Sequence, residues 1–142
     1  MNKCYFKRPG ENAIIKEFDY NEPLNDTLEQ KDFYVGHALL LRTQNIYWYA
    51  FFDDNGIIDY HNGLLKYNCN LPSYGEFQNQ IFGNLVIMKI KHVYDQEYCI
   101  DITQEDLEYL NSILYSIDSS EIYKKEDVKR WQKRMLEALQ NH

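Results

Sequence analysis

Four histidines and three cysteines are the residues of this sequence best suited to metal or nucleophilic chemistry, but their spacing favours neither. They are His37, His61, His92, His142, Cys4, Cys69 and Cys99. None of them forms the short paired spacing that holds a structural zinc ion. Cys69 with His61 or His92 could form a thiolate–imidazole pair, but no nucleophile motif accompanies them. We therefore expect Cys69 to be a core or surface residue, and we predict no metal site and no cofactor.

The acidic pairs Asp53-Asp54 and Glu105-Asp106 also have chemical capacity. Asp53-Asp54-Asn55-Gly56 begins like a calcium loop, which needs oxygen ligands at alternate positions and a Glu at position twelve. Ile57-Ile58 follows at once, so the ligand series is missing. Acid–base catalysis needs a carboxyl group with a raised pKa inside a cleft, which a solvated acidic run does not predict. We expect a turn and a helix cap. The G-x-S-x-G, P-loop and G-x-G-x-x-G motifs are also missing, so the sequence favours a protein that is not an enzyme.

Charge is distributed unevenly along a chain of single-domain length. The 142 residues carry a net charge of −7, with 44% hydrophobic and 26% charged residues. Residues 121–142 hold six basic and four acidic side chains, so residues 1–120 carry −9. We predict one domain, 1–142, made of an acidic body (1–120) and a basic amphipathic C-terminal helix (121–142).

This composition argues against several classes of partner. An acidic surface repels phosphate backbones, so we expect the body not to bind nucleic acid directly. No apolar run has the length of a membrane span, and the N-terminus lacks a secretory signal pattern. Three cysteines without a pairing pattern fit a reducing compartment. We expect a cytoplasmic protein that does not bind membranes.

Hydropathy patterns predict strands early in the chain. Segments 4–7 and 13–18 indicate a hairpin, and Pro23 indicates the start of a short helix. Segment 33–42 alternates with Phe33, Val35, His37, Leu39 and Leu41 on one face, and 45–52 is apolar on both faces. A strand of the second kind is usually covered on both sides; if one side is open, its tyrosine row is a contact surface. Asn55-Gly56 predicts a hairpin turn, followed by short strand pieces at 57–58 and 64–65.

The second half of the chain combines an irregular segment, a hairpin and two helices. Residues 68–83 have the least regular pattern. Segments 84–91 and 97–102 predict paired strands, and Thr103 predicts the cap of a helix. That helix should turn Leu107, Leu110, Leu114 and Ile117 to the sheet. A last helix should begin near Lys125 and pack a stripe of apolar residues on the sheet: Val128, Trp131, Met135 and Leu139. The fold class predicted is α+β, a mostly antiparallel sheet with two C-terminal helices packed against it.

Four short segments resemble a family of small uncharacterised α+β domains found in phages and mobile elements. They are 13–18, Asp54-Asn55-Gly56, 81–87 and 101–107. The aromatic strand at 46–52 and the basic tail after Ser120 depart from the family pattern. The resemblance implies a compact α+β domain and an accessory gene context. It implies no catalytic residues.

The leading hypothesis is an interaction protein that blocks a host protein, similar to anti-restriction and anti-CRISPR inhibitors. An acidic face with exposed tyrosines would occupy a site on a nucleic-acid-binding host protein. The residues predicted to bind the partner are Asp95, Glu97, Asp101, Glu105, Asp106, Glu108, Tyr98 and Tyr109.

Three alternatives remain open at the level of the sequence. A small-ligand or nucleotide-binding protein would use Tyr74 and Phe77 for stacking and Arg42 and Lys66 for phosphate. An enzyme would require a deep cleft with a buried Cys–His or carboxylate pair. The opposite charges of body and tail also permit a homodimer.

Overall fold

The structure is a computed structural model that describes residues 1–72 and 79–141, and it has an α+β fold with mostly antiparallel strands. The strands are β1 (Asn2–Lys7), β2 (Ile14–Phe18), β3 (Val35–Thr43), β4 (Ile46–Asp53), β5 (Tyr67–Leu71), β6 (Asn79–Phe82), β7 (Leu85–Val93) and β8 (Gln96–Ile100). The helices are α1 (Leu24–Leu28), α2 (Gly56–His61), α3 (Gln104–Ile113) and α4 (Lys125–Gln140), with a 3₁₀ turn at Ser119–Glu121. The prediction that the helices are C-terminal is wrong for α1 and α2, which lie between strands.

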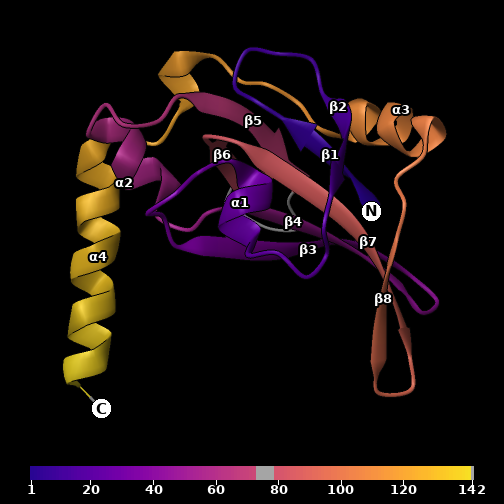
Figure 1. Ribbon diagram of the computed structural model, residues 1–142. Helices are drawn as coiled ribbons and strands as arrows, with labels where there is room; N and C mark the ends of the chain where they lie inside the picture. The colour runs from indigo at the N-terminus through magenta and orange to yellow at the C-terminus, as the bar shows by residue number, and fades with distance from the viewer. Residues whose placement is uncertain (73–78, 142) are drawn as a thin grey trace.

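Six of these strands form one sheet, in the order β2-β1-β7-β4-β3, with β8 added beside β7. β7 lies at the centre of this strand order. Its residues Leu85, Val86, Ile87 and Met88 are all buried, as expected for a strand that is covered on both faces. Its second half continues past β1 and pairs with β8 from Lys89 to Val93. The β7–β8 hairpin therefore extends below the body in Figure 1.

The two faces of the sheet carry separate cores. The first core joins Trp48 and Ile87 of the sheet to Leu110 of α3 and to Leu71 and Ile81 of the β5–β6 ribbon. The second core lies on the opposite face, where α1 contributes the buried Leu28. One face is thus covered by a helix and a ribbon, whereas the helix that packs on the other face in the described residues, α1, has only five residues.

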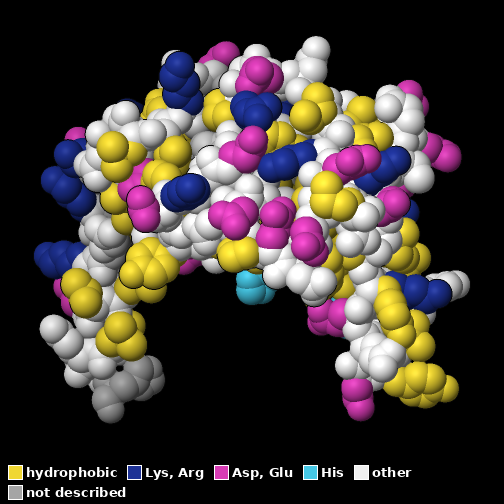
Figure 2. Space-filling model, viewed as in Figure 1, with side chains coloured by type: hydrophobic (Ala, Val, Ile, Leu, Met, Phe, Trp, Pro, Cys, Tyr) yellow, Lys and Arg dark blue, Asp and Glu magenta, His cyan; other side chains and the backbone are white. Residues whose placement is uncertain are grey.

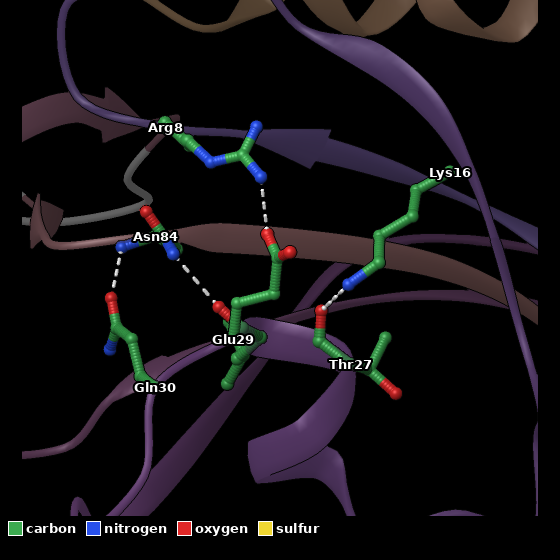
Figure 3. A network of polar contacts seen from close by, with 7 residues as sticks. Arg8, Lys16, Thr27, Glu29, Gln30 and Asn84 are labelled. Carbon is green, nitrogen blue, oxygen red and sulfur yellow. Dashed lines mark hydrogen bonds and ion pairs between the residues drawn. The ribbon is translucent and has the colours of Figure 1, made fainter.

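Polar bonds fasten the short helix α1 to the sheet, as Figure 3 shows. Lys16 Nζ donates to the Thr27 carbonyl at 2.6 Å, and Asn84 Nδ2 donates to the Leu28 carbonyl at 2.8 Å. The Arg8 guanidinium lies 2.5 Å from Glu29, which has a positive φ of 57° where α1 ends. A helix this short is unstable alone, so these bonds and Leu28 hold it in place.

A bulge makes the predicted facing of β3 wrong beyond Leu39. The pairing with β4 shifts between Leu39 and Leu41, and a bulge turns the following side chains to the other face. Leu40 is buried in the first core, and past the bulge Leu41 packs against the same core, while His37 and Leu39 on the other face are exposed.

The predicted hairpin turn at Asn55-Gly56 is also wrong, because α2 begins there. Asp53 Oδ1 accepts a hydrogen bond from the Asn55 N–H, and Asn55 has a φ of −102° rather than the positive value of such a turn. Gly56 is needed for space, since a Cβ there would come within 3.3 Å of Phe82. The strand predictions for 57–58 and 64–65 are wrong as well. Ile57 and Ile58 are in α2, and Leu64 and Leu65 are in an irregular segment.

Residues 68–83, predicted as irregular, contain most of β5 and the whole of β6, which pair with each other. After α3 ends at Ile113, the chain becomes extended, and Asn70 and Tyr115 exchange two backbone hydrogen bonds at 2.7 and 3.2 Å. This bridge explains why Leu114 and Ile117 lie outside the helix predicted for them. The segment after α3 thus pairs with β5 at Tyr115 instead of continuing the helix.

The C-terminal helix α4 begins at Lys125 as predicted, but it does not lie along the sheet. Val128 is buried, and Tyr123 and Trp131 form an edge contact with ring centroids 4.8 Å apart. His61 Nε2 lies 2.7 Å from the Tyr123 carbonyl, which ties the start of the helix to α2. Figure 1 shows the rest of α4 projecting from the body, opposite the β7–β8 hairpin.

Candidate functional site

The residues predicted to bind a partner lie in three places rather than on one face. Asp95 is in the turn of the β7–β8 hairpin, and the next two, Glu97 and Tyr98, are consecutive on β8 and so point to opposite faces of the sheet. The others lie just before α3 or on it: Asp101, Glu105, Asp106, Glu108 and Tyr109.

Two of these acids hold the start of α3. Thr103 Oγ1 accepts from the Asp106 N–H, and Asp106 Oδ2 accepts from the Thr103 N–H at 2.9 Å, forming a capping box. Lys89 Nζ lies 3.1 Å from Asp106. Burial alone raises the pKa of Asp106, but the bonds from Thr103 and Lys89 outweigh it and hold the pKa below its ordinary value. Asp101 Oδ1 accepts from the Lys3 N–H at 3.0 Å, so both acids have structural partners.

Glu97 belongs to the sheet face that α1 leaves partly open. It accepts a hydrogen bond from the Tyr20 hydroxyl at 3.2 Å, and its other oxygen lies 3.7 Å from His92 Nδ1. Burial, together with the Glu97 charge, raises the pKa of Tyr20 to about 12. Glu97 is therefore engaged within the molecule and separated from the α3 acids by the sheet.

The remaining acids of this set are exposed. Within the described part of the chain, the side chains of Asp95, Glu105 and Glu108 make no hydrogen bond or ion pair, and Tyr98 and Tyr109 are 50% and 44% exposed. These five residues are the part of the predicted surface that is open to a partner.

The open face of the sheet carries a row of aromatic rings. Tyr47 and Tyr49 are parallel with centroids 6.1 Å apart, and the Arg42 guanidinium lies 4.9 Å from the Tyr47 centroid. His37 contacts Tyr49 and Phe51 edge-on or at a tilt, with centroids 6.3 and 6.4 Å apart. Tyr47, Tyr49 and Phe51 form the side of β4 that was predicted to be a contact surface if open, and all three side chains are half-buried.

The residues predicted for a small ligand do not converge. Arg42 is paired with Tyr47, which pairs with Ile90 of β7. The Lys66 carbonyl accepts a hydrogen bond from the Gly83 N–H. Gly83 precedes Ile90 by seven residues, which corresponds to about 23 Å along an extended chain, so Lys66 lies far from Arg42. Tyr74 and Phe77 lie outside the described residues, so the stacking prediction cannot be placed on the fold.

The thiolate–imidazole pairing is not formed. Cys69 is buried in the first core, and burial raises the pKa of its thiol to about 11. His61 is occupied by the Tyr123 carbonyl, and His92 lies against Tyr47 with ring centroids 4.5 Å apart. A neutral buried thiol is a poor nucleophile; of the two places expected for Cys69, core or surface, it occupies the core.

The feature that sequence reasoning missed is the exposed apolar stripe of α4. Met135 is 67% exposed, Leu136 59% and Leu139 71%. Figure 2 shows hydrophobic atoms on the side of α4 that faces the hollow beneath the body and basic atoms on its outer side. The signal was present, because a 3.6-residue apolar period predicts a buried stripe without showing what buries it.

An apolar groove continues this stripe onto the body. It has a volume of about 570 Å³ and lies between α4, β6 and the end of β4. Its apolar lining residues are Phe52, Ile57, Ile81, Phe82, Tyr123, Trp131 and Met135. We call Met135, Leu136, Leu139 and this groove the α4 surface.

Two other kinds of site were tested against the geometry. Among residues 1–72 and 79–141, no three His, Cys, Asp or Glu side chains come together as a metal site would require. In the same residues, no helix has the length and apolar character needed to cross a membrane.

Comparison with known proteins gave no relative: no family model, curated protein or solved structure matches this chain.

Proposed function

We propose that this chain is a cytoplasmic, non-enzymatic protein that binds another protein through the α4 surface. The observation that carries the proposal is the exposure of Met135, Leu136 and Leu139 on a helix that leaves the body. Clustered large apolar side chains in water mark an interaction site. Covering each of them would contribute about 1–2 kcal/mol.

The charge on α4 defines the partner that fits it. The outer face of the helix carries Lys129, Arg130 and Lys133, and its one ion pair within the described chain is internal, between Arg130 and Asp127. An apolar groove rimmed by carboxylates would complement both faces, which is how an amphipathic helix binds in a groove. Two copies of α4 side by side would bring like charges together, so a homodimer through this helix is disfavoured.

A matched pair of double variants tests this proposal. Met135→Gln with Leu139→Gln removes the apolar stripe, whereas Ile14→Gln with Leu39→Gln makes the same chemical change at exposed apolar positions of the sheet, outside the α4 surface. None of the four replacements changes the net charge. Each tagged chain is used for quantitative capture from a lysate of the organism that encodes it, after sedimentation velocity has established its oligomeric state.

The stripe variant should lose a partner at least about tenfold relative to the control variant, because hot-spot apolar residues dominate such interfaces. Equal recovery of every captured protein by both variants would exclude the α4 surface as the docking element. A dimer of the wild type that becomes a monomer in the stripe variant would identify a second copy as the partner.

A narrower form of the proposal concerns an acidic surface. Asp95, Glu105 and Glu108, with Tyr98 and Tyr109, are exposed and make no ion pair with α4 in the described structure. These features support a partner that normally binds nucleic acid, as a phage or mobile-element inhibitor of host defence would require. Opposite charge across such an interface chiefly raises the association rate and makes it salt-dependent.

Charge reversal separates this form from the broader proposal. Glu105→Lys with Glu108→Lys should slow association with the captured partner, while Glu11→Lys with Asp32→Lys, at exposed positions outside α3 and β8, should not exceed the general effect of net charge. Association rates are measured from 50 to 300 mM salt. If both pairs change the rate equally at every salt concentration, the acidic surface is not the contact.

A further inference from the structure

A cavity of about 440 Å³ lies between the segment before β3, the end of β4 and α2. Its lining consists of Lys31, Asp32, Phe33, Tyr34, Asp53, Asn55, Asp59 and Leu64. The α4 surface shares none of these residues, so the cavity is a separate site.

Asp53 gives the cavity a buried polar atom that lacks a partner. The residue is only 4% exposed. Its Oδ1 accepts from the Asn55 N–H at 2.9 Å, but its Oδ2 is buried and has no donor within the described structure. A buried carboxylate oxygen without a donor is costly, so a proton or a cation is the missing partner.

The side chain beside Asp53 belongs to Asp59 of α2, and the two carboxyl groups share a hydrogen bond when one of them is protonated. Burial, followed by this bond and by the charges of Asp59 and Asp54, raises the pKa of Asp53 to about 7. A cation between the two carboxylates would take the place of the shared proton.

The walls of the cavity are apolar and aromatic. Phe33 is half-buried, while Tyr34 and Leu64 are 77% and 65% exposed at its mouth. Aromatic faces attract cations, and apolar walls accommodate a methylene chain.

We propose that this cavity binds an organic cation, an ammonium or guanidinium group on an apolar chain, held by Asp53 and Asp59 beside Phe33 and Tyr34. Paired carboxylates match the fork of a guanidinium group. A calcium ion takes six to eight oxygen ligands, and the described residues bring no third carboxylate to this pair. The cation could come from an arginine or lysine side chain of a protein or from a free polyamine.

Proton release gives this binding a definite dependence on pH. Asp53 must be ionised to hold the cation, so affinity should rise between pH 6 and pH 8, by up to about tenfold for a pKa near 7. The other charged or titratable groups facing the pair are Lys31, Asp32, Tyr34 and Asp54. Asp53→Asn should abolish this pH dependence.

The test is isothermal titration of the full chain with agmatine, and with the tripeptide acetyl-Gly-Arg-Gly-amide, at pH 6 and pH 8. We expect one site per chain with a Kd of about 1 mM or tighter at pH 8. Tighter binding of the tripeptide identifies a protein side chain as the source, and tighter binding of agmatine identifies a free amine. Neither probe binding to the folded chain would overturn the proposal.

Two variants locate the binding. Asp59→Asn should weaken agmatine binding about tenfold or more, since it removes one charged partner. Asp95→Asn is the control, because that exposed side chain lies in the β7–β8 turn, outside the lining of the cavity. An equal loss in both variants would indicate general attraction to negative charge and overturn the proposal. Displacement of agmatine by a lower concentration of CaCl₂ would also overturn it, in favour of a metal ion.

Discussion

Replacing Asp53 with Asn should stabilise this protein, and the gain should grow with pH. Asn at this position keeps an oxygen to accept the Asn55 N–H and adds an amide that can donate to Asp59. It therefore imitates the protonated aspartic acid at every pH. The wild type has to ionise a carboxyl group that is 4% exposed and adjacent to another carboxylate.

The sign and size of the effect follow from the pKa of Asp53. The pKa is about 7 in the folded protein against 3.8 for the ordinary group, so the folded state binds the proton more tightly. The cost of ionisation is absent below pH 3.8, grows as the pH rises and is complete above pH 7. Two pH units, from 5 to 7, correspond to about 2–3 kcal/mol as an upper limit, which contact with the cavity reduces.

Urea denaturation at pH 5 and pH 8, followed by tryptophan fluorescence, measures this difference. The free energy of unfolding of Asp53→Asn minus that of the wild type should be larger at pH 8 by about 1–3 kcal/mol. Asp95→Asn, at an exposed position in the β7–β8 turn, should show less than about 0.5 kcal/mol of such change. If the free energy of unfolding of Asp53→Asn exceeds that of the wild type by the same amount at both pH values, the burial argument is refuted. The ionisation of Asp53 on cation binding is refuted with it.

Three further perturbations test the fold. Leu110→Ala should lower the free energy of unfolding by about 2–5 kcal/mol in urea denaturation, because Leu110 is fully buried in the first core; a loss below 1 kcal/mol would contradict the docking of α3. Asp106→Ala should cost about 1–3 kcal/mol at pH 7 by removing the cap and lysine bonds. The pKa of Asp106 is lowered in the folded protein, so this difference should shrink as the pH falls below the ordinary carboxyl pKa and through the lowered pKa of Asp106; a difference that does not shrink in acid would refute this assignment. Met135→Gln with Leu139→Gln should change stability by less than about 0.5 kcal/mol, since both side chains are exposed, and a larger loss would show that the stripe packs within the chain.

Local signals predicted the elements whose partners are near in sequence. The β1–β2 and β7–β8 hairpins and the start of α3 at Thr103 were all predicted, because turn residues and a capping pair act within a few positions. The hairpin turn predicted at Asn55-Gly56 is wrong because the role of Gly56 depends on a tertiary contact. Gly56 is required by the close approach of Phe82, and not by a positive φ.

The candidate sites depended on longer-range information. The sequence predicts the apolar stripe of α4 but cannot show that Val128 is buried while Met135 and Leu139 remain in solvent. Asp53 and Asp59 are separated by six positions, and only the turn into α2 brings their carboxyl groups together. Sequence reasoning named a buried carboxylate pair as the feature that an enzyme would need, and it assigned Asp53 only to a turn.

Hydrogen exchange of the chain with its captured partner tests the central claim most directly. In the free chain, the backbone amides of the last two turns of α4 should exchange rapidly, because their side chains are exposed and the helix end frays. In the complex these amides should be protected at least about tenfold, with smaller changes over α3 and β8. Unchanged exchange in α4, with protection confined to another surface, would contradict the account.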